Sequence, residues 1–390
     1  MAYDISRKLV ERGHSVVVYT SDIRDENTQM DTVYSKVDGV NVFYFKNLSL
    51  SAAKRNLFVT PSLISAVKNN VKSFDVVHIH GNRTTQSPVL HYFLKKNSVP
   101  YVVQAHGGLP IIGGRRLKQL YDLFFGHELL KDASKVIALT RTEAQQYRCM
   151  GVPKEKIEVI PNGIDLTEYA DLPPKGYFKK KFGIDEGKRI ILYLGRIHKT
   201  KGIDFLVKAY ARFVRSLGHN NVILVIAGPD DGYLGKIWRL VDSLEIVDKI
   251  MFTGTLLEKE KVSAYVDSDI VVNVEPRNVF GLVPLESAAC STPVIVSKGN
   301  AISEIIRQGK FGFSVKYGDI YELAETMRKM LNDNNLLREM GQNGRKFVFE
   351  NFNWTDIVVK FEKVYEEIIA RKRCCIKPFS EFYKNNNSCA

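Results

Sequence analysis

Residues 191–213, ILYLGRIHKTKGIDFLVKAYARF, combine a buried strand, a basic loop and a helix in one short stretch. The apolar run that ends at Leu194 predicts the strand, and Gly195 permits a tight exit from it. The helix is expected to begin near Asp204. Strand, loop and helix in this order form the repeating unit of parallel α/β folds, whose ligands bind at the loops that follow strands.

The same alternation runs through most of the chain. Strand-like runs are predicted first at 14–19, 40–45, 76–80, 101–104, 135–139 and 157–160, and after a break at 172–188 they resume at 190–194, 222–226, 250–253, 270–274 and 293–296. Strands that alternate with helices indicate parallel sheets covered by helices on both faces. We therefore expect an α/β fold with two Rossmann-like domains, residues 1–170 and 187–352, that face a central cleft.

The pattern changes near the C-terminus. Residues 353–373 predict one long helix that packs along one apolar face, and residues 374–390 are polar without periodicity, which indicates a loose tail. Arg371, Lys372 and Arg373 are compatible with a contact to acidic lipid head groups, but a solvated tail is the favoured interpretation.

Composition narrows the class of protein. The 390 residues carry a net charge of +13, which suits phosphorylated substrates or an anionic membrane surface, yet no nucleic-acid-binding module accompanies it. The sequence has neither a signal peptide nor an apolar run long enough to span a membrane, which predicts a cytoplasmic protein, in peripheral contact with the inner membrane face at most. The five cysteines lack paired spacing and are interpreted as reduced thiols: Cys149, Cys290, Cys374, Cys375 and Cys389.

Two loops carry residues suited to a nucleotide. Arg196 and Lys201 precede a helix start, where fixed cations, backbone amides and the helix dipole all favour a diphosphate; a solvated basic loop is the alternative. Glu286 lies one turn into a helix predicted from Leu282 to Ala289, where a carboxylate can accept hydrogen bonds from ribose hydroxyls; the alternative is a solvated helix glutamate.

These loops belong to a set of motifs that together resemble a known family. The motifs are QAHGG at 104–108, EVIPNGID at 158–165, GRIHKTKG at 195–202, IAGPDDGYL at 226–234, FTGTL at 252–256 and NVFGLVPLE at 278–286. Their order and spacing resemble those of the retaining glycosyltransferases of family 4. The resemblance implies the GT-B fold, with an acceptor-side first domain, a second domain that binds a nucleotide-diphosphate sugar, and a C-terminal helix that returns toward the first domain.

The resemblance also implies roles for individual residues. It places donor binding on Gly195, Arg196, Lys201, Asn278, Phe280, Gly281, Leu282 and Glu286. Arg196 and Lys201 match the pair that stabilises the leaving diphosphate. His106 matches a histidine that faces the reacting sugar, although a strand-end histidine bonded to backbone is the alternative. The implied enzyme is hexosyltransferase-like, and the departing phosphate oxygen takes the acceptor's proton on the same face.

No metal or other cofactor is expected besides the nucleotide sugar, which is a co-substrate. Asp267, Ser268 and Asp269 fit the Asp-any-Asp pattern that holds a metal in glycosyltransferases of another fold. Here the pattern ends a helix just before a strand. Its carboxylates are therefore expected at the end of the sheet that faces away from the cleft.

Three departures from the family are visible. The family's first glutamate falls on the uncharged Asn278, with Glu275 three residues earlier as a substitute, and one of two frequent glycines before Glu304 is absent. Residues 1–14 match the helix that follows a first strand and a glycine-rich loop, neither of which is present. We therefore expect Met1 to be an internal methionine or a misplaced start, with the strand and the loop encoded in frame upstream.

Three functions remain open from the sequence. The first is a sugar transferase that acts on a glycan, a lipid-linked precursor or another cell-envelope acceptor, as in polysaccharide biosynthesis. The second is a catalytically impaired remnant that binds a nucleotide sugar, and the third, less favoured, is a nucleotide-sugar isomerase of the same fold. The donor's base and sugar, the acceptor, the linkage and the oligomeric state cannot be deduced from these residues.

Overall fold

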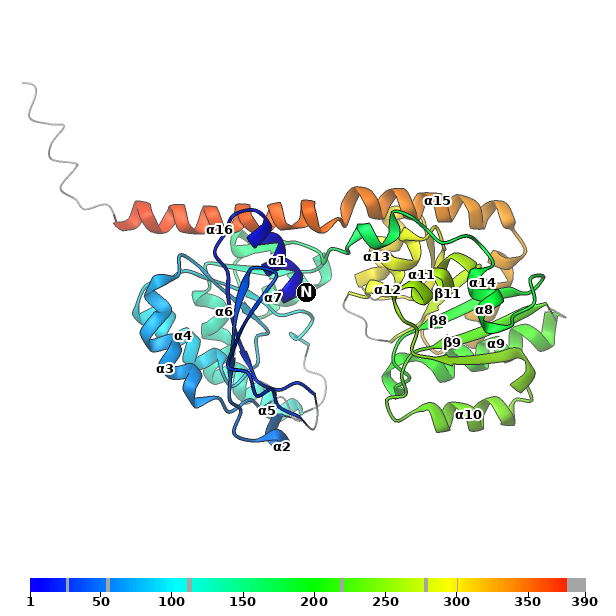
Figure 1. Cartoon of the computed structure of the whole chain (residues 1–390), viewed down its shortest axis with the longest axis horizontal. Helices are drawn as coiled ribbons and strands as arrows, with labels where there is room; N and C mark the ends of the chain where they lie inside the picture. Colours follow the sequence, from blue (N-terminus) through cyan, green and yellow to red (C-terminus); the bar gives the residue numbers. More distant parts are fainter. Residues whose placement is uncertain are drawn as a thin grey trace, which may run out of the picture. The chain divides into compact units, whose positions relative to one another are not determined.

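A computed structural model describes residues 1–25, 28–53, 57–110, 114–217, 221–276, 280–299 and 301–376. The chain divides into two compact units, which are coloured along the sequence in Figure 1. Unit 1 comprises Met1–Asn162 and Trp354–Ala390, and unit 2 comprises Gly163–Asn353. Each unit has its own buried apolar clusters.

Unit 1 contains two sheets. The larger one is parallel, in the order β4 (Val77–His80), β5 (Tyr101–Gln104), β6 (Lys135–Ala138) and β7 (Ile157–Val159). The smaller one has the order β1 (Val17–Ser21), β3 (Val40–Phe45) and β2 (Tyr34–Val37), with β2 antiparallel to β3. Among the described strands, β1 and β4 each pair on one side only, so backbone bonds do not join the two sheets.

Helices flank the strands of the larger sheet along the chain. They are α3 (Pro61–Asn70), α4 (Ser87–Lys96), α5 (Arg115–Tyr121), a π-helical turn (Asp122–Gly126), α6 (His127–Asp132), α7 (Arg141–Cys149) and α16 (Trp354–Ile376), with the short α2 (Leu50–Ala53) after β3. β5 and β6 are buried along their whole length, and their sequences are apolar except for Gln104 and Lys135. The fully buried strands form the rigid platform from which the loops of this unit emerge.

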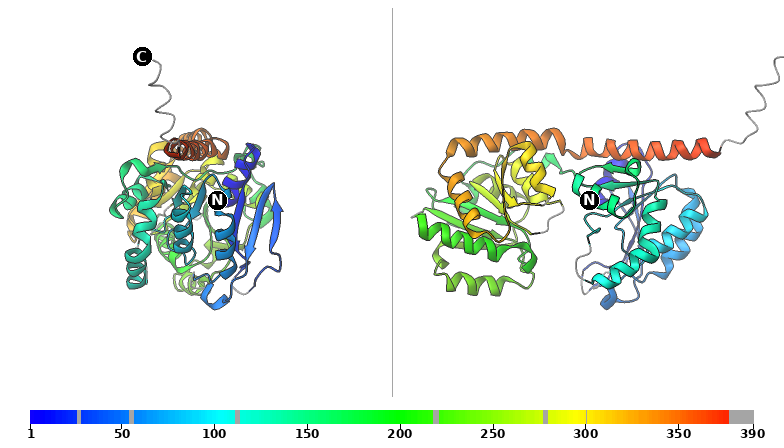
Figure 2. Two further views of the ribbon diagram at one scale, coloured as in Figure 1. Left: turned by 90° about the vertical axis from the view of Figure 1, so that its left-hand side faces the viewer. Right: turned by 180° about the vertical axis from the view of Figure 1, so that it is seen from behind.

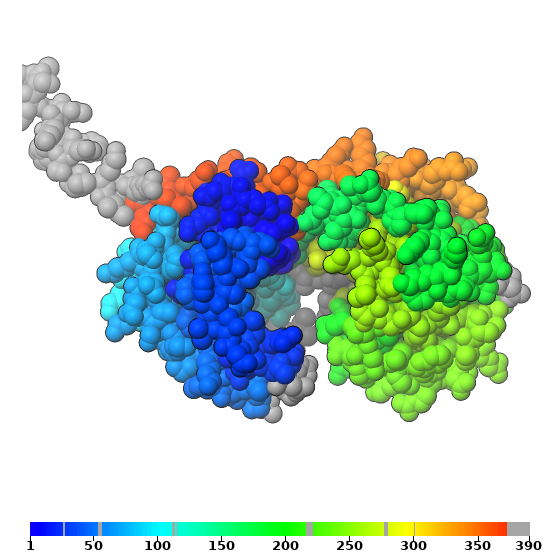
Figure 3. All heavy atoms as spheres, in the orientation of Figure 1, coloured from blue at the N-terminus to red at the C-terminus, as the bar shows by residue number. Residues whose placement is uncertain are grey.

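The first and last helices of unit 1 pack together. The predicted amphipathic helix is α1 (Ala2–Glu11), and it contacts α16, as expected for a C-terminal helix that returns to the first domain. Glu362 accepts hydrogen bonds from Arg12 at 2.5 Å and lies 2.7 Å from His14. In the space-filling view, α1 and the small sheet form the dark blue outer face of unit 1 (Figure 3).

Unit 2 is built around one parallel six-stranded sheet. Its order is β10 (Ile250–Gly254), β9 (Val222–Ala227), β8 (Arg189–Leu194), β11 (Ile270–Asn273), β12 (Val294–Ser297) and β13 (Gly312–Val315). The surrounding helices are α8 (Tyr177–Phe182), α9 (Ile203–Leu217), α10 (Leu234–Ser243), α11 (Glu258–Asp267), α12 (Leu282–Ala289), α13 (Ala301–Gly309), α14 (Ile320–Leu331) and α15 (Asn334–Asn351). Two apolar clusters, one on each face of the sheet, form the core.

The α/β prediction with two parallel Rossmann-like sheets is confirmed, but two strands were missed. β2 is joined to β3 by Asp38 and Gly39, both with positive φ (47° and 81°), which is the geometry of a tight hairpin. The Asp-Gly pair was a readable hairpin signal. β13 is only four residues long and contains two polar or small residues, so no apolar run marks it.

Several predicted bounds also shift by a few residues. The first strand begins at Val17 and not at His14, and the last helix extends to Ile376. The predicted tail lies almost wholly outside the described residues. In the described part of the chain, no helix is both long and apolar enough to cross a membrane.

Candidate functional site

The loops after β8 and β9 of unit 2 lie in direct contact. Gly195 and Gly228 leave the two strands with φ of 152° and 141°, and a Cβ placed on Gly228 would lie 2.0 Å from the Gly195 carbonyl oxygen. Only glycine fits at so close an approach. Ile197 and Asp230 then pair as a parallel bridge, so the two loops continue side by side beyond the sheet.

Arg196 and Lys201 are both held by carboxylates from neighbouring loops. The Arg196 Nη1 atom lies 2.6 Å from Asp231 Oδ2, and the arginine side chain is 64% exposed. The Lys201 Nζ atom lies 2.8 Å from Glu275 Oε1, with both of these side chains largely buried. Gly202 lets the Lys201 loop approach the loop that carries Glu275. Its φ is +72°, and a Cβ there would lie 2.5 Å from the carbonyl oxygen of Val274, the residue before Glu275.

Glu286 is held inside unit 2 and is not a solvated helix residue. Its side chain is 15% exposed. Its Oε2 accepts a hydrogen bond from the Tyr265 hydroxyl at 2.7 Å, and its Oε1 lies 3.4 Å from Lys261 Nζ. Burial raises the pKa of Tyr265, which keeps the hydroxyl protonated as the donor. The carboxylate is therefore fixed, with lone pairs left for further donors.

The start of α12 lies on the loop after β11. No side chain in the described part of the chain caps this helix at Gly281, so its first backbone N–H groups have no side-chain acceptor there. Phe280 packs against Phe352 with a ring-centroid distance of 6.3 Å, while Leu282 is 39% exposed. Backbone N–H groups at such a helix start favour phosphate oxygens.

Two residues of the predicted donor loops cannot be placed. Asn278 and Asn300 lie outside the described residues. Glu275, the expected substitute for the family's first glutamate, is the partner of Lys201.

His106 lies in unit 1, directly after β5, with φ of +49°. Its Nε2 atom is 2.8 Å from His80 Nδ1, so it is paired with a side chain rather than with backbone. The His80 ring stacks in turn on His78, whose Nδ1 lies 2.7 Å from the Tyr365 hydroxyl on α16. Burial lowers the pKa of His106 to about 4 and that of His80 to about 3, so both rings are neutral at pH 7.

Other residues fix the loop that carries His106, and the sequence did not reveal them. Glu143 accepts hydrogen bonds from the backbone N–H of Gly107 and of Leu139, each at 2.6 Å. Arg83 donates to the carbonyl oxygens of Gly108 and Leu109. For the stacked histidines, the sequence does offer a signal: His78 and His80 alternate at the end of a strand, and alternate residues of a strand share a face.

Unit 1 also holds unpaired polar groups near His106. In the described part of the chain, the Nδ2 atom of Asn82 and both amide atoms of Gln104 are buried without a hydrogen-bond partner. Asn82 and Gln104 are 2% and 0% exposed. Such groups are rare in native cores and occur at sites that bind ligands or water.

The Asp267–Asp269 pattern has a structural role at the amino-terminal end of β11, opposite the end that carries the donor loops. Asp267 accepts hydrogen bonds from the backbone N–H of Gly176 at 2.6 Å and of Lys179 at 3.0 Å. Asp269 lies 2.8 Å from Arg189 Nη2, before the first residue of β11. Its placement away from the donor loops is as predicted. Among the described residues, no three His, Cys, Asp or Glu side chains are arranged to hold a metal ion.

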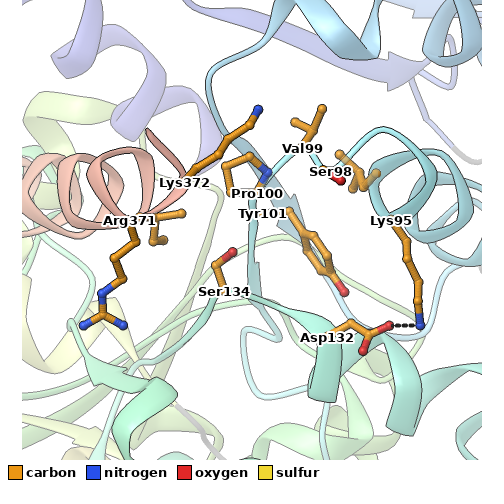
Figure 4. Close-up of a pocket in the computed structure, with 11 residues that line it drawn as sticks. Lys95, Ser98, Val99, Pro100, Tyr101, Asp132, Ser134, Arg371 and Lys372 are labelled. Carbon is orange, nitrogen blue, oxygen red and sulfur yellow. Dashed lines mark hydrogen bonds and ion pairs between the residues drawn. The ribbon is translucent and has the colours of Figure 1, made fainter. Parts of the chain in front are cut away.

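A separate pocket of about 470 Å³ lies at the amino ends of β5 and β6. Figure 4 shows Tyr101, Asp132 and Lys95 on one side of it and Arg371 and Lys372 of α16 on the other, with Lys95 Nζ 2.6 Å from Asp132 Oδ2. His106 follows the opposite, carboxyl end of β5. The pocket is therefore not part of the candidate site.

Comparisons with known proteins cover both units. Residues 1–168 match the family described as Glycosyltransferase Family 4, and residues 175–347 match Glycosyl transferases group 1. The N-acetyl-alpha-D-glucosaminyl L-malate synthase of Bacillus anthracis is 25% identical over 379 residues, which cover 94% of this chain and 92% of the relative.

Two solved structures have a similar fold. Anabaena Alr3699/HepE, solved in complex with UDP and glucose, superposes with a TM-score of 0.74 at 18% identity, covering 94% of this chain and 95% of HepE. WaaG, a glycosyltransferase involved in lipopolysaccharide biosynthesis, superposes with a TM-score of 0.68 at 19% identity, covering 94% of each chain. These neighbours support the GT-B fold.

Proposed function

Because the chain belongs to the retaining glycosyltransferases of family 4, we propose that it transfers a sugar from a nucleotide-diphosphate donor to a glycan or lipid-linked acceptor of the cell envelope. The observation that carries the proposal is the pair Arg196 and Lys201 at the strand ends of unit 2. Each cation forms an ion pair with a carboxylate of an adjacent loop. A diphosphate carries more negative charge than either carboxylate and can replace both as the partner.

Donor binding follows from three neighbouring features of unit 2. In this proposal Arg196 and Lys201 hold the diphosphate, the first turn of α12 adds backbone donors, and Glu286 accepts from the ribose hydroxyls. The HepE structure contains UDP and glucose, so UDP-glucose is the first donor to test.

The reaction needs charge stabilisation more than a protein nucleophile. The bond between the anomeric carbon and the diphosphate oxygen breaks, and the acceptor oxygen forms a bond to the anomeric carbon on the same face of the sugar. The departing diphosphate oxygen takes the proton of the acceptor hydroxyl. Arg196 and Lys201 stabilise the charge that develops on the diphosphate. His106, neutral at pH 7, is suited to hydrogen-bond a sugar hydroxyl rather than to act as a cation.

The acceptor is proposed on weaker grounds than the donor. The net charge of +13 suits an anionic or membrane-associated acceptor, and WaaG acts in lipopolysaccharide biosynthesis. The Bacillus anthracis relative, by its name, forms an N-acetylglucosaminyl malate, in which the acceptor is the small anion L-malate. Peripheral contact with an anionic membrane would bring the enzyme to a lipid-linked acceptor.

The test is turnover of a panel of nucleotide sugars by the purified full chain. Release of the nucleoside diphosphate and transfer to an acceptor, with NMR of the anomeric proton showing retention, would support the proposal. Arg196→Ala and Lys201→Ala should abolish most turnover, whereas Lys208→Ala, an exposed lysine on α9, should not. Donor binding without turnover would favour the remnant, and a product that is still a nucleotide sugar would favour the isomerase.

A further inference from the structure

Five large apolar side chains on one helical segment of unit 1 are exposed to solvent. Leu117, Leu120, Leu123, Phe124 and Phe125, on α5 and the following π-helical turn, are 76%, 50%, 67%, 67% and 47% exposed. We call these five residues the α5 surface. Soluble domains rarely expose such a contiguous apolar run unless it binds a partner or a membrane.

The orientation of this segment is fixed by its buried side. Asp122 is paired with Arg83, both of them largely buried, at 2.6 Å. A Cβ on Gly126 would lie 2.7 Å from Asp122 Oδ1, so the helix packs closely at this turn. Leu129, further along, is 1% exposed. The apolar side chains therefore face solvent because a polar, ion-paired side faces the core.

Exposed apolar residues of a second segment lie beside the α5 surface. Leu48, Leu57 and Val59 are 64%, 49% and 43% exposed. The backbone of Leu48 bonds to that of Val59, and a hydrogen bond from Thr85 to the Phe58 carbonyl links this segment to the loop after β4.

The same loop joins the second segment to α5. Tyr121 donates from its hydroxyl to the Thr84 carbonyl oxygen at 2.8 Å. Figures 1 and 2 show α2 and α5 at the same end of unit 1. The exposed side chains of Lys46 and Arg116 place positive charge at this end.

We propose that the α5 surface docks the protein on an anionic lipid bilayer. Apolar side chains that project from an end of the fold, with basic residues beside them, match the interfacial region of such a bilayer, where the apolar groups enter and the cations meet head groups. The chain's net charge of +13 adds long-range attraction to the same surface.

The position of this surface connects docking to the reaction. Arg83, in the loop after the carboxyl end of β4, pairs with Asp122 next to α5 and donates to the Gly108 and Leu109 carbonyl oxygens. The α5 surface and His106 therefore lie at the same end of the unit 1 sheet. A docked protein would present this end to membrane-embedded acceptors. This consequence rests on the proposed function, whereas docking itself does not.

The basic residues of α16 form a different region of unit 1. Arg371 and Lys372 line the pocket at the amino ends of β5 and β6, where α6 ends at Asp132. The helical segment from Arg115 to Asp132 runs between the two ends, and its 18 residues span about 27 Å. Substitutions can therefore distinguish the two regions.

The test is co-sedimentation of the full chain with two kinds of vesicle. One kind contains phosphatidylcholine alone, and the other contains phosphatidylcholine with about 30% phosphatidylglycerol, which is anionic. The wild type should bind the anionic vesicles, and Leu120→Glu with Phe124→Glu should weaken partitioning by about tenfold or more. The matched control is Leu257→Glu with Tyr321→Glu in unit 2, where the two side chains are 71% and 63% exposed, and it should bind like the wild type.

Four outcomes would overturn the proposal. The first is that the wild type does not bind the anionic vesicles, and the second is that the control variant loses as much vesicle binding as the α5 variant. The third is that vesicle binding is lost only with Arg371→Glu and Lys372→Glu. The fourth is that the α5 variant changes its oligomeric state while its vesicle binding is unchanged. The last would assign the surface to a second copy of the chain. Circular dichroism, measured on every variant, reports folding. Donor turnover in solution tests the proposed transfer separately from docking.

Discussion

Among single residues, Arg196 and Lys201 are the ones that we most expect to bind the donor diphosphate. In the described chain each contacts a carboxylate, and both contacts use loops that follow strands of one sheet. Lys201 is the more restrained of the two, because Gly202 packs against Val274 and the lysine side chain is only 24% exposed. The more exposed Arg196 has greater freedom to change partner.

Lys201→Ala should lower kcat/KM by roughly 30- to 1000-fold, which corresponds to about 2–4 kcal/mol of lost transition-state stabilisation. The reason is that a largely buried cation stabilises a leaving diphosphate more than a solvated one does. Steady-state kinetics with the identified donor measure the effect. Lys208→Ala is the control, and equal kinetics for both variants would remove Lys201 from the site.

The stacked histidines of unit 1 predict a pH dependence of stability. Burial lowers the pKa of His106 to about 4 and of His80 to about 3, below the ordinary value of 6.5. The unfolded chain therefore binds more protons as the pH falls below about 6.5, and the folded state loses stability. Between pH 7 and pH 5 the loss should be about 1–2 kcal/mol for each histidine.

Tryptophan fluorescence can measure this in unit 1 alone. Trp354 is buried in unit 1, and the chain's other tryptophan, Trp238, lies on α10 of unit 2. Urea unfolding of Trp238→Phe at pH 7 and pH 5 therefore follows unit 1. His106→Gln in that background should reduce the pH dependence, whereas His127→Gln, at an exposed position, should preserve it. An unchanged slope in His106→Gln would contradict the prediction.

At the scale of elements, Asp267 joins two helices of unit 2. It ends α11 and accepts two backbone hydrogen bonds at the start of α8, at 7% exposure. The motif that resembles a metal site therefore has a local structural use. The physical reason is that a buried carboxylate at a helix start satisfies backbone donors that would otherwise be unpaired.

Asp267→Ala should destabilise unit 2 by about 1–3 kcal/mol, because two backbone donors lose their acceptor. Chemical denaturation measures the loss. Turnover by the remaining folded enzyme should be unchanged, and EDTA should not lower the turnover of the wild type. Activity that disappears in both cases and returns with Mn²⁺ would contradict the prediction and assign a metal to these carboxylates.

At the scale of the whole molecule, the candidate residues are distributed over two units. Arg196, Lys201 and Glu286 belong to unit 2, whereas His106 belongs to unit 1. The predicted domain boundaries at 170 and 187, and the cleft between the domains, stay predictions. A nucleotide that binds without an acceptor should therefore stabilise mainly unit 2.

Hydrogen exchange with and without UDP tests this division. At a UDP concentration 100 times its Kd, the stabilisation should be about 2.7 kcal/mol, and peptides from the ends of β8, β9 and β11 should exchange more slowly. Peptides from β5 and β6 of unit 1 serve as the internal control. Protection confined to unit 1 would overturn the assignment of the nucleotide to unit 2.

The sequence by itself determined the α/β class, both parallel sheets and the helix after β11, because apolar periodicity and strand-ending glycines are local signals. The family motifs also indicated Arg196, Lys201, Glu286 and His106. The partners of these residues came only from the tertiary structure. Asp231, Glu275, Tyr265 and His80 are distant in sequence from the residues they contact, and no local pattern specifies which loops meet at a sheet edge.

The exposed face of α5 was likewise decided by tertiary structure. From sequence, Leu120 and Phe124 are typical of a core-facing stripe, at the spacing of one helical turn. The buried ion pair between Arg83 and Asp122 and the close packing of Gly126 turn the opposite side inward. Periodicity reports that a helix has an apolar face, but the contacts made by its other side determine whether that face meets the core or the solvent.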